Sequence, residues 1–373
     1  MRAFVVWLAL GVVACDATAQ KSTLDRPLDG VAKVVVFAKG LDNPWGLAFL
    51  PDGRALVTEK GGRVRYVGTD GKLSEPLTGV PKVDDGGQGG LLGVAIDPQF
   101  ATNRLVYLAF SEPGDGGTAG TSVAKGRLGE RGLEDVQVIY RQVPKVRSGN
   151  HSGSRLVFDR DGNLFVTQGD RFNQRPLVQD LGTDIGKIVR ITTDGGVPPD
   201  NPFVNRPGVR PEIWSYGHRN AQGAALHPET GRLWTVEHGA QGGDELNRPE
   251  AGKNYGWPVI TYGVDYSGAK IGEGTAKEGM EQPVHYWDPS IAPSGLVIYT
   301  GDAFPDWKGD YFTGSLKFGR LVRLELEGDK VVKEERYLGE RGERIRDVVQ
   351  GPDGLLYLLT DPGNVLRLEP VKR

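Results

Sequence analysis

The sequence is poor in cysteine, in net charge and in long hydrophobic runs. Of its 373 residues only Cys15 is a cysteine, so no disulfide can form within one chain. Lysine and arginine number 45 against 48 aspartates and glutamates, and the basic residues are scattered along the chain. This charge pattern argues against nucleic acid as a partner. One apolar run, from Ala3 to Ala14, is too short to span a bilayer comfortably, so we expect no membrane span.

The N-terminal residues have the layout of a secretory signal peptide. Arg2 precedes the apolar run, and Ala17-Thr18-Ala19 forms a small-residue cleavage site. Cys15 follows Val-Val-Ala, so lipoprotein processing at Cys15 is the alternative. We therefore expect residues 1–19 to be a signal peptide, or a lipoprotein signal that ends before Cys15. The mature protein is then periplasmic or secreted, or lipid-anchored facing the periplasm, which fits a chain without disulfides.

No long stretch has the 3.6-residue periodicity of a helix, whereas glycine (55 residues) and proline (24 residues) are abundant. Aromatic and β-branched residues remain plentiful, so the composition indicates many short strands joined by turns. One pattern recurs six times: a short apolar strand, a turn rich in Asp, Pro and Gly, and a second apolar strand. The copies run from Gly46 to Thr58, Leu91 to Leu108, Leu156 to Thr167, Ala224 to Val236, Leu296 to Thr313 and Val348 to Thr360.

A third strand of the type Gly-x-apolar-x-Arg follows several copies, as in Gly62 to Arg65 and Gly186 to Arg190. Such a small antiparallel unit cannot bury its faces alone, so the units must pack face to face, and a closed ring leaves no exposed ends. The sequence thus predicts an all-β fold, a single six-bladed β-propeller of antiparallel four-stranded blades over residues 30–370. A two-sheet sandwich or an irregular all-β enzyme is the alternative.

The hairpins also predict where polar side chains gather. An antiparallel hairpin returns the end of its second strand to the start of its first, so residues at these two positions should share one face of the ring. This face combines a base, carboxylates, amides and cations around a concave axis, the usual setting of a small-molecule site. The residues are Asn43, Trp45, Gln88, His151, Arg219, Asn220, Ser294, Arg344 and Arg346 before first strands, and Glu59, Lys60, Asp170, His238, Ser315, Lys317 and Asp361 after second strands.

The cations of this face predict a positively charged pocket in a slightly acidic protein. Lys317, Arg344, Arg346 and Arg219 would suit an anionic ligand with several carboxylates, because guanidinium groups bind carboxylates in a bidentate manner. The alternative is that these cations form structural ion pairs with Asp170, Asp347 and Asp361.

His151 lies in Gly-Asn-His-Ser-Gly, and Asp170 ends the next strand of the same hairpin. A histidine hydrogen-bonded to a carboxylate is held in one tautomer and becomes a better base, so this pair can take a proton from a hydroxyl. An ordinary polar role for His151 is the alternative. His218, His227 and His285 lack metal-ligand spacing and are expected to be structural.

The segment from Glu237 to Asn247 is acidic and rich in backbone carbonyls, which are ligands for hard cations such as Ca²⁺. It lacks the spacing of an EF-hand, so this stretch alone does not establish calcium. The run from Asp85 to Gly90 is rich in glycine but is no dinucleotide fingerprint, because no helix or βαβ unit follows it.

Taken together, these motifs resemble the soluble glucose/sorbosone dehydrogenase family that depends on pyrroloquinoline quinone (PQQ), most closely its aldose sugar dehydrogenase branch. They run in family order over nearly the whole mature chain. The motifs are Gln88-Gly89-Gly90-Leu91-Leu92-Gly93, Gly217-His218-Arg219-Asn220-Ala221-Gln222-Gly223, Asp244-Glu245-Leu246-Asn247, Asn254-Tyr255-Gly256-Trp257-Pro258, Gly314-Ser315-Leu316-Lys317 and Glu343-Arg344-Ile345-Arg346-Asp347.

The resemblance implies a PQQ site and two calcium ions. Its cofactor-binding residues would be Gln88, Arg219, Asn220, Tyr266, Ser315, Lys317, Arg344 and Arg346. Backbone carbonyls of Gly239 and Ala240 would hold the calcium that touches the cofactor, while Glu245 and Tyr255 match a second, structural calcium site. His238 stands where glucose dehydrogenases of the family have glutamine, so the sequence departs from the family pattern beside the first calcium site.

The implied activity is oxidation of aldose sugars at the anomeric carbon to lactones. His151, oriented by Asp170, would take the proton of the anomeric hydroxyl while hydride passes to PQQ, and Arg219 and calcium would stabilise charge on the quinone oxygen. A sugar is then the small-molecule substrate, and a quinone or a small redox protein accepts the electrons. The alternatives are a calcium-dependent propeller lactonase or esterase, and a propeller that only binds sugar or protein.

Overall fold

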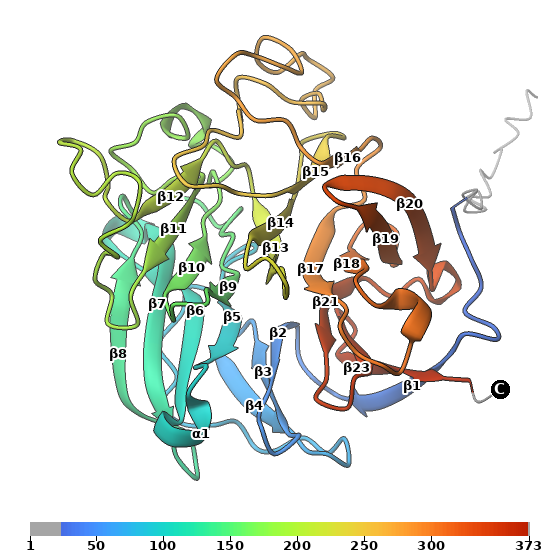
Figure 1. The fold of residues 1–373 in the computed structure, drawn as a ribbon. Helices are drawn as coiled ribbons and strands as arrows, with labels where there is room; N and C mark the ends of the chain where they lie inside the picture. Colours follow the sequence, from blue (N-terminus) through green and yellow to red (C-terminus); the bar gives the residue numbers. More distant parts are fainter. Residues whose placement is uncertain (1–23, 372–373) are drawn as a thin grey trace, which may run out of the picture.

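Six small antiparallel sheets are arranged around a common centre in the computed structural model, which describes residues 24–371 (Figure 1). The first strands of the sheets contact one another in a closed ring, in the order β2, β5, β9, β13, β17 and β21 and back to β2. This arrangement confirms the predicted six-bladed β-propeller. The predicted signal peptide and Cys15 lie outside the described residues.

The first three sheets follow one another along the chain, and their neighbouring strands pair antiparallel. The first sheet consists of β2 (Pro44–Phe49), β3 (Ala55–Glu59) and β4 (Arg63–Val67). The second consists of β5 (Leu91–Ile96), β6 (Leu105–Pro113), β7 (Ala119–Leu128) and β8 (Leu133–Arg141). The third consists of β9 (Leu156–Phe158), β10 (Leu164–Thr167), β11 (Lys187–Ile191) and β12 (Ile213–Tyr216).

The last three sheets repeat this pattern, and the final one takes its outer strand from the other end of the chain. The fourth sheet consists of β13 (Ala221–Leu226), β14 (Leu233–Glu237), β15 (Asp244–Asn247) and β16 (His285–Trp287). The fifth consists of β17 (Pro293–Ile298), β18 (Tyr311–Ser315), β19 (Leu321–Glu327) and β20 (Lys330–Tyr337). The sixth consists of β21 (Ile345–Gln350), β22 (Leu356–Thr360), β23 (Asn364–Pro370) and β1 (Ala32–Lys39).

One sheet departs from the prediction of four strands in every blade. The sheet of β2 to β4 has three strands in the described part of the chain, and residues 68–90 run on to β5 without adding a fourth. Pro76 and Pro81 in this segment have no N–H group to donate to a ladder, which disfavours a paired strand there.

The six predicted hairpins all form. Strands β2 and β3, for example, are joined at Pro51-Asp52-Gly53, where Gly53 has φ 85° and donates its N–H to the Leu50 carbonyl at 3.0 Å. The side chain of Asp52 accepts the N–H of Arg54 at 3.0 Å and so closes the turn. The connection between β5 and β6 contains the one α-helix of residues 24–371, α1 (Phe100–Asn103), a single turn.

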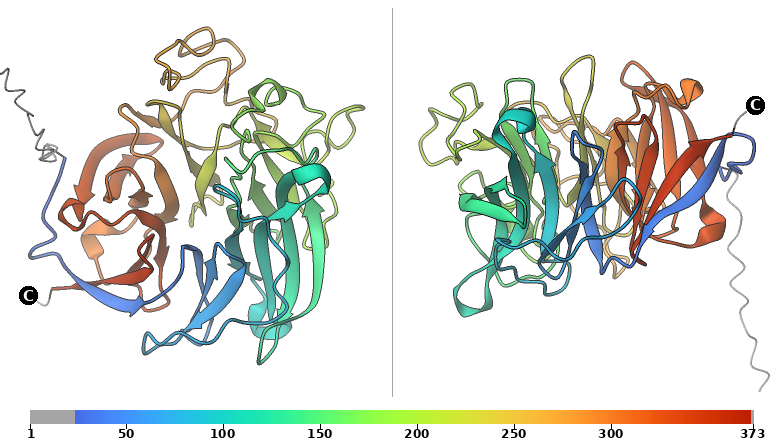
Figure 2. Two further views of the ribbon diagram at one scale, coloured as in Figure 1. Left: turned by 180° about the vertical axis from the view of Figure 1, so that it is seen from behind. Right: turned by 90° about the horizontal axis from the view of Figure 1, so that it is seen from below.

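The ring is closed by pairing between the two ends of the described chain. Strand β1 lies antiparallel to β23, with Val34 opposite Leu368, and the views of Figure 2 show these two strands side by side. Apolar side chains fill the spaces between neighbouring sheets; Leu56, Leu91 and Leu108, for example, are fully buried between the first and second sheets. Burying each such side chain stabilises the fold by roughly 1.5 to 3 kcal/mol before entropy is counted.

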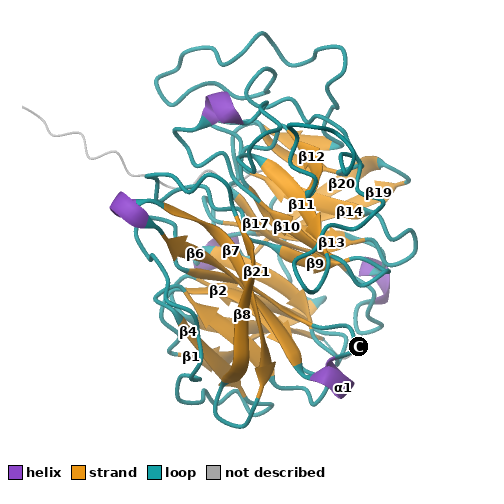
Figure 3. Cartoon of the chain, turned by 90° about the vertical axis from the view of Figure 1, so that its left-hand side faces the viewer, coloured by secondary structure: helices purple, strands orange, loops and turns teal. Residues whose placement is uncertain are grey.

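Loops occupy both ends of the strands, and helix is limited to single turns (Figure 3). The longest connection, residues 248–284 between β15 and β16, extends beyond the sheets at the top of Figure 1. Among the described helices none has the length and apolar character needed to cross a membrane.

Candidate active site

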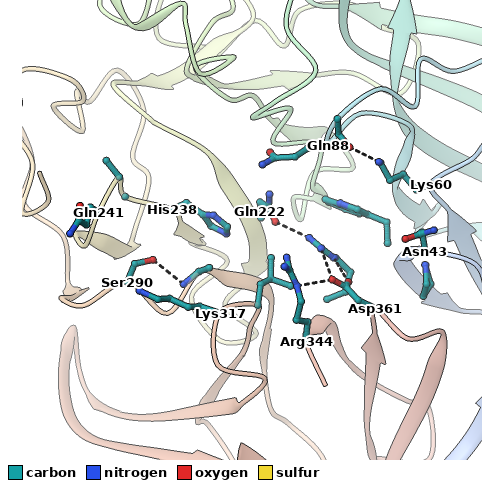
Figure 4. Close-up of a pocket in the computed structure, with 18 of the residues that line it drawn as sticks. Asn43, Lys60, Gln88, Gln222, His238, Gln241, Ser290, Lys317, Arg344 and Asp361 are labelled. Carbon is teal, nitrogen blue, oxygen red and sulfur yellow. Dashed lines mark hydrogen bonds and ion pairs between the residues drawn. The ribbon is translucent and has the colours of Figure 1, made fainter. Parts of the chain in front are cut away.

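A cavity of about 690 Å³ opens on the face where the first strands begin. Side chains before first strands and after second strands line it together, as the hairpin argument predicts. In Figure 4, Gln88 and Lys60 lie across the cavity from Lys317 and Arg344. The principal polar and aromatic lining residues are Asn43, Trp45, Lys60, Gln88, Gln222, His238, Gln241, Tyr266, Ser290, Lys317, Arg344, Arg346 and Asp361.

Three predicted cations meet at this cavity with only one carboxylate between them. Arg344 Nε lies 2.8 Å from one oxygen of Asp361, and Arg346 Nε donates to the other at 3.0 Å. Lys317 has no carboxylate partner among residues 24–371, and its Nζ lies 5.3 Å from the centre of the Phe318 ring. The ion-pair alternative therefore holds for the two arginines, but one aspartate cannot neutralise three cations. The cavity keeps a positive charge that suits an anionic ligand.

His151 and Asp170 form a buried pair beside the cavity. His151 Nδ1 lies 2.6 Å from Asp170 Oδ1, and both side chains are nearly inaccessible to water. The ionised carboxylate accepts a hydrogen bond from Nδ1–H, which leaves Nε2, with its free lone pair, as the basic atom of the ring. The backbone N–H of His151 donates to Gln88 Oε1 at 3.0 Å, and Gln88 lines the cavity, so this bond connects the pair to the cavity lining.

The electrostatics keep His151 neutral and Asp170 charged. Burial lowers the pKa of His151 below the ordinary imidazole value, and the charge of Arg219 adds to this, although the Asp170 hydrogen bond acts in the opposite direction. Burial alone would raise the pKa of Asp170, but the His151 hydrogen bond, the positive charge of Arg219 and the Phe172 N–H together outweigh it and lower that pKa. A neutral imidazole beside a carboxylate is the protonation state that a general base needs.

Trp257 completes the support of Asp170 from the long loop between β15 and β16. Its indole Nε1–H donates to Asp170 Oδ2 at 2.8 Å. The Trp257 ring also makes cation–π contacts with two guanidinium groups, that of Arg219 at 5.2 Å and that of Arg175 at 5.3 Å from its centre. Both oxygens of Asp170 are thus engaged, and the carboxylate is held in one orientation.

Arg219 and Asn220 each keep a buried donor without a partner. Arg219 donates to the His238 carbonyl and the Tyr266 hydroxyl, both at 3.2 Å, but its Nε atom has no acceptor in the described structure. Asn220 accepts the Gly153 N–H at 3.2 Å, while its Nδ2 group is likewise unpartnered. Buried donors that lack acceptors are expensive, so these two atoms point to a ligand that supplies oxygen or nitrogen acceptors.

His238 lines the cavity as a neutral ring. Its Nε2–H donates to the Pro293 carbonyl at 2.7 Å. Burial, together with the charge of Arg219, lowers the pKa of His238 to about 3. Gly239 and Ala240, the next two residues, also line the cavity, and the Gly239 N–H is fixed by Asp244 Oδ1 at 2.8 Å.

Ser315 lies beneath the cavity and does not line it. Its hydroxyl donates to the Ile291 carbonyl at 2.6 Å and accepts the Phe318 N–H at 3.1 Å, and the side chain is buried. These bonds shape the turn that carries Lys317 towards the cavity. The Ser315 hydroxyl is thus bonded to the backbone and lies outside the cavity lining, so its predicted contact with a ligand stays a prediction.

Glu245 and Tyr255 belong to a second polar cluster, under the fourth sheet. Glu245 stands opposite Glu237 across the β14–β15 ladder, and Asn247 Nδ2 donates to both carboxylates, at 2.9 and 2.8 Å. Burial and the charge of Glu237 raise the pKa of Glu245 to about 8. The Tyr255 ring stacks on His218, which pairs with Glu237 at 2.9 Å. Within residues 24–371, no three His, Cys, Asp or Glu side chains form a metal-binding group.

Comparisons with known proteins show the family to which the chain belongs. The family model described as Glucose / Sorbosone dehydrogenase matches residues 41–367. The chain belongs to this family. It is 50% identical over 344 residues to aldose sugar dehydrogenase YliI of Escherichia coli, covering 90% of this chain and 92% of the relative. It is 27% identical over 412 residues to quinoprotein glucose dehydrogenase B of Acinetobacter calcoaceticus, covering 88% and 86%.

Solved structures of family members share the fold of this chain. The apo-form of the soluble aldose sugar dehydrogenase from Escherichia coli is 49% identical, with a TM-score of 0.89 and coverage of 91% of this chain and 100% of that one. The PQQ-bound form of an aldose sugar dehydrogenase from Streptomyces coelicolor is 31% identical, with a TM-score of 0.76 and coverage of 92% and 99%.

Sequence reasoning missed three residues around the His151–Asp170 pair of this family member. Trp257 stood in a quoted motif without a role, and Arg171 and Phe172 were not singled out. Trp257 is 87 residues from Asp170 along the chain, so no local pattern could join them. Arg171 and Phe172 directly follow Asp170, and that adjacency was the available signal.

Proposed function

We propose that this chain is a PQQ-dependent aldose sugar dehydrogenase that oxidises the anomeric carbon of aldoses to lactones. The observation that carries the proposal is a neutral His151, hydrogen-bonded to Asp170, beside a cavity that is lined by Lys317, a cation with no carboxylate partner in the described residues. A base and an anion-binding surface are the two functions that this reaction requires of the protein.

The donor set fits PQQ, a planar quinone with three carboxylates. Lys317, Arg344 and Arg346 offer charged donors for carboxylates, and the unpartnered Nε–H of the Arg219 guanidinium and the Nδ2 group of the Asn220 amide offer donors for further oxygens. Gln88 and Tyr266 would bound the cofactor at the rim. When bound, PQQ supplies the two-electron acceptor that takes hydride from the anomeric carbon.

The chain itself handles the proton. His151 Nε2 would take the proton of the anomeric hydroxyl, and the Asp170 carboxylate would stabilise the resulting imidazolium through the 2.6 Å hydrogen bond at Nδ1. Trp257 and the backbone N–H of Phe172, which donates to Asp170 Oδ1 at 2.7 Å, hold the Asp170 carboxylate in place. The carboxylate in turn fixes the orientation of the His151 imidazole. Oxidation of the hydroxyl then leaves the lactone.

The proposal includes two calcium ions. Carbonyls of Gly239 and Ala240 would bind one at the cavity, where hard oxygen ligands suit Ca²⁺. Glu245 and Tyr255 would serve the second. That site is supported by two adjacent buried carboxylates, which repel each other without a cation, and by Asn247 Oδ1, a buried oxygen with no partner in the described residues.

We further propose that the enzyme is exported to the periplasm or secreted, with a quinone or small redox protein as electron acceptor. The support is the layout of Arg2, the apolar run and Ala17-Thr18-Ala19. Mass spectrometry of protein from its native host should find a terminus at Gln20 or a lipid on Cys15, and an intact Met1 would contradict both forms of export.

The absorption spectrum tests the proposed activity. Purified protein titrated with PQQ and Ca²⁺ should show a saturable change in the quinone spectrum, and addition of an aldose should convert it to that of the reduced cofactor. A redox dye should then be bleached catalytically, with lactone as product. Protein that binds no PQQ would overturn the proposal. Protein that hydrolyses lactones and never reduces bound PQQ would favour the lactonase alternative.

A further inference from the structure

Phe172 combines an exposed aromatic ring with a strained backbone next to the proposed base. It lies in the loop after β10, two residues beyond Asp170, and is 40% exposed. Its φ is 64° and that of Arg171 is 53°, so two consecutive non-glycine residues adopt the left-handed region, which is unfavourable for residues with a Cβ atom. Of the large apolar residues that are exposed within residues 24–371, Phe172 alone has a positive φ.

Specific contacts hold this conformation in place. The Phe172 N–H donates to Asp170 Oδ1, and the buried Arg171 guanidinium donates to Ser152 Oγ at 2.6 Å and to the Ser148 carbonyl. The two residues therefore send their side chains in opposite directions. Arg171 turns inward to clamp the loop of His151, and Phe172 is left facing outward.

The outward ring stands directly beside the base. The ring centres of Phe172 and His151 are 5.3 Å apart with an interplanar angle of 84°. On its other side Phe172 meets Tyr266, with centres 6.4 Å apart and planes inclined by 29°. Tyr266 is 58% exposed and lines the cavity. The two rings, from loops far apart in the sequence, form one apolar wall that leads to His151.

Core packing does not account for this wall, because a half-exposed phenylalanine gains little from folding while its backbone stays strained. Strain that surrounding contacts maintain is typical of functional sites. A pyranose ring carries an apolar face of axial C–H groups beside its polar hydroxyls, and aromatic rings offer a flat, electron-rich surface to such a face. The wall therefore matches a six-membered sugar ring.

We propose that Phe172 is a specificity-determining residue that packs its ring against the C–H face of an aldopyranose, with Tyr266 extending the same wall. This inference rests on the proposed function and names its substrate class. Packing there would place the sugar next to His151, because the ring centres of Phe172 and His151 are only 5.3 Å apart. The rim position of both rings leaves one side of the sugar open to solvent.

The test uses the PQQ- and Ca²⁺-reconstituted enzyme with D-glucose as the probe. Phe172→Ala should raise KM on the order of 3- to 10-fold, the range expected for loss of one aromatic contact, with a smaller change in kcat. Phe172→Tyr should restore the wild-type KM, and PQQ affinity should be unchanged in both. Tyr286→Ala removes an exposed aromatic ring that stacks on Tyr262, away from His151 and Phe172; it is the matched control and should leave KM unaltered.

Saturation-transfer NMR provides a readout that does not depend on turnover. In reconstituted enzyme without an electron acceptor, the axial C–H protons of D-glucose should receive saturation from aromatic protons, and Phe172→Ala should lose most of it. Unchanged transfer and unchanged KM would overturn the inference. A fall in kcat with unchanged KM and a shifted acid limb in the pH profile would also overturn it. That result would mean that Phe172 only positions His151 and does not contact the sugar. Wild-type enzyme that bound PQQ but oxidised no aldose would instead reject the proposed function, and the NMR result would still decide the contact.

Discussion

Lys317 differs from the other cations of the cavity because no carboxylate pairs with it in the described part of the chain. Its charge is therefore available to a ligand, whereas Arg344 and Arg346 share Asp361. A charged hydrogen bond contributes roughly 1.5 to 3 kcal/mol, so Lys317→Ala should weaken PQQ binding about 10- to 100-fold. Arg344→Ala should cost less. The measurement is PQQ titration followed by absorbance, and unchanged affinity in the Lys317, Arg344 and Arg346 variants would refute the assignment.

The protonation of His151 sets the expected pH dependence. Because burial lowers its pKa below 6.5, the base stays neutral at neutral pH, and kcat/KM should fall only below the ordinary imidazole range. Asp170 raises that pKa, so Asp170→Asn should lower it further and move the acid limb to lower pH. His151→Gln should lose about 10²- to 10⁴-fold in kcat while still binding PQQ. The pH profiles of kcat/KM check the direction, and an acid limb that moved upward in Asp170→Asn would contradict the pairing.

At the scale of elements, the long loop between β15 and β16 contributes Trp257, which contacts both Asp170 and Arg219. Trp257→Phe keeps an aromatic ring between Arg219 and Arg175 but removes the N–H bonded to Asp170 Oδ2. Leaving that buried oxygen unpaired costs about 1 to 3 kcal/mol, part of which should appear as a lower kcat with little change in PQQ affinity.

Trp287→Phe is the control for that variant. Trp287 donates its indole N–H to Glu334 at 3.1 Å, on the fourth sheet and outside the cavity lining. Both variants should lose thermal stability, but only Trp257→Phe should lose turnover. Equal kinetics in the two variants would show that Trp257 is merely structural. Differential scanning fluorimetry and dye reduction measure the two effects.

Elements whose contacts are local could be predicted from the sequence, and those that depend on distant contacts could not. The six hairpins follow from alternating apolar residues and from turns such as Pro51-Asp52-Gly53, because both strands of a hairpin are adjacent in the chain. Their geometry then placed Lys317 and Arg346 at one cavity. The sequence did not show that the Ser315 hydroxyl bonds to the Ile291 carbonyl, 24 residues away, or that the Trp257 indole bonds to Asp170, 87 residues away. Each bond depends on a partner from another segment of the chain.

For the whole molecule, the cluster of Glu237 and Glu245 links folding stability to pH and cations. The pKa of Glu245 is about 8 in the folded state, above its ordinary value of 4.5. A raised carboxyl pKa contributes stability that is complete below pH 4.5 and is lost as pH rises towards 8. Metal-free protein should therefore become less stable over this window, and Ca²⁺ should restore stability most strongly at pH 8.

Thermal unfolding in EDTA and in Ca²⁺, at pH 5 and pH 8, measures this linkage. Calcium at a hundredfold excess over its Kd should add about 2.7 kcal/mol to the free energy of unfolding. Glu245→Gln should flatten the pH dependence and reduce the calcium effect to that of the site at Gly239 and Ala240, whereas Glu273→Gln, at an exposed position of the neighbouring loop, should alter neither. An unchanged calcium response in Glu245→Gln would remove this residue from the metal site.

The pairing of β1 with β23 also sets an order of events during biosynthesis. Strand β23 is the last to leave the ribosome, so β1 must wait for nearly the entire chain before it finds its partner. Until then the sheet of β21 and β22 lacks its two outer strands and the ring stays open. Completion of the ring is therefore a late step of folding, because its last sheet needs strands from both ends of the described chain.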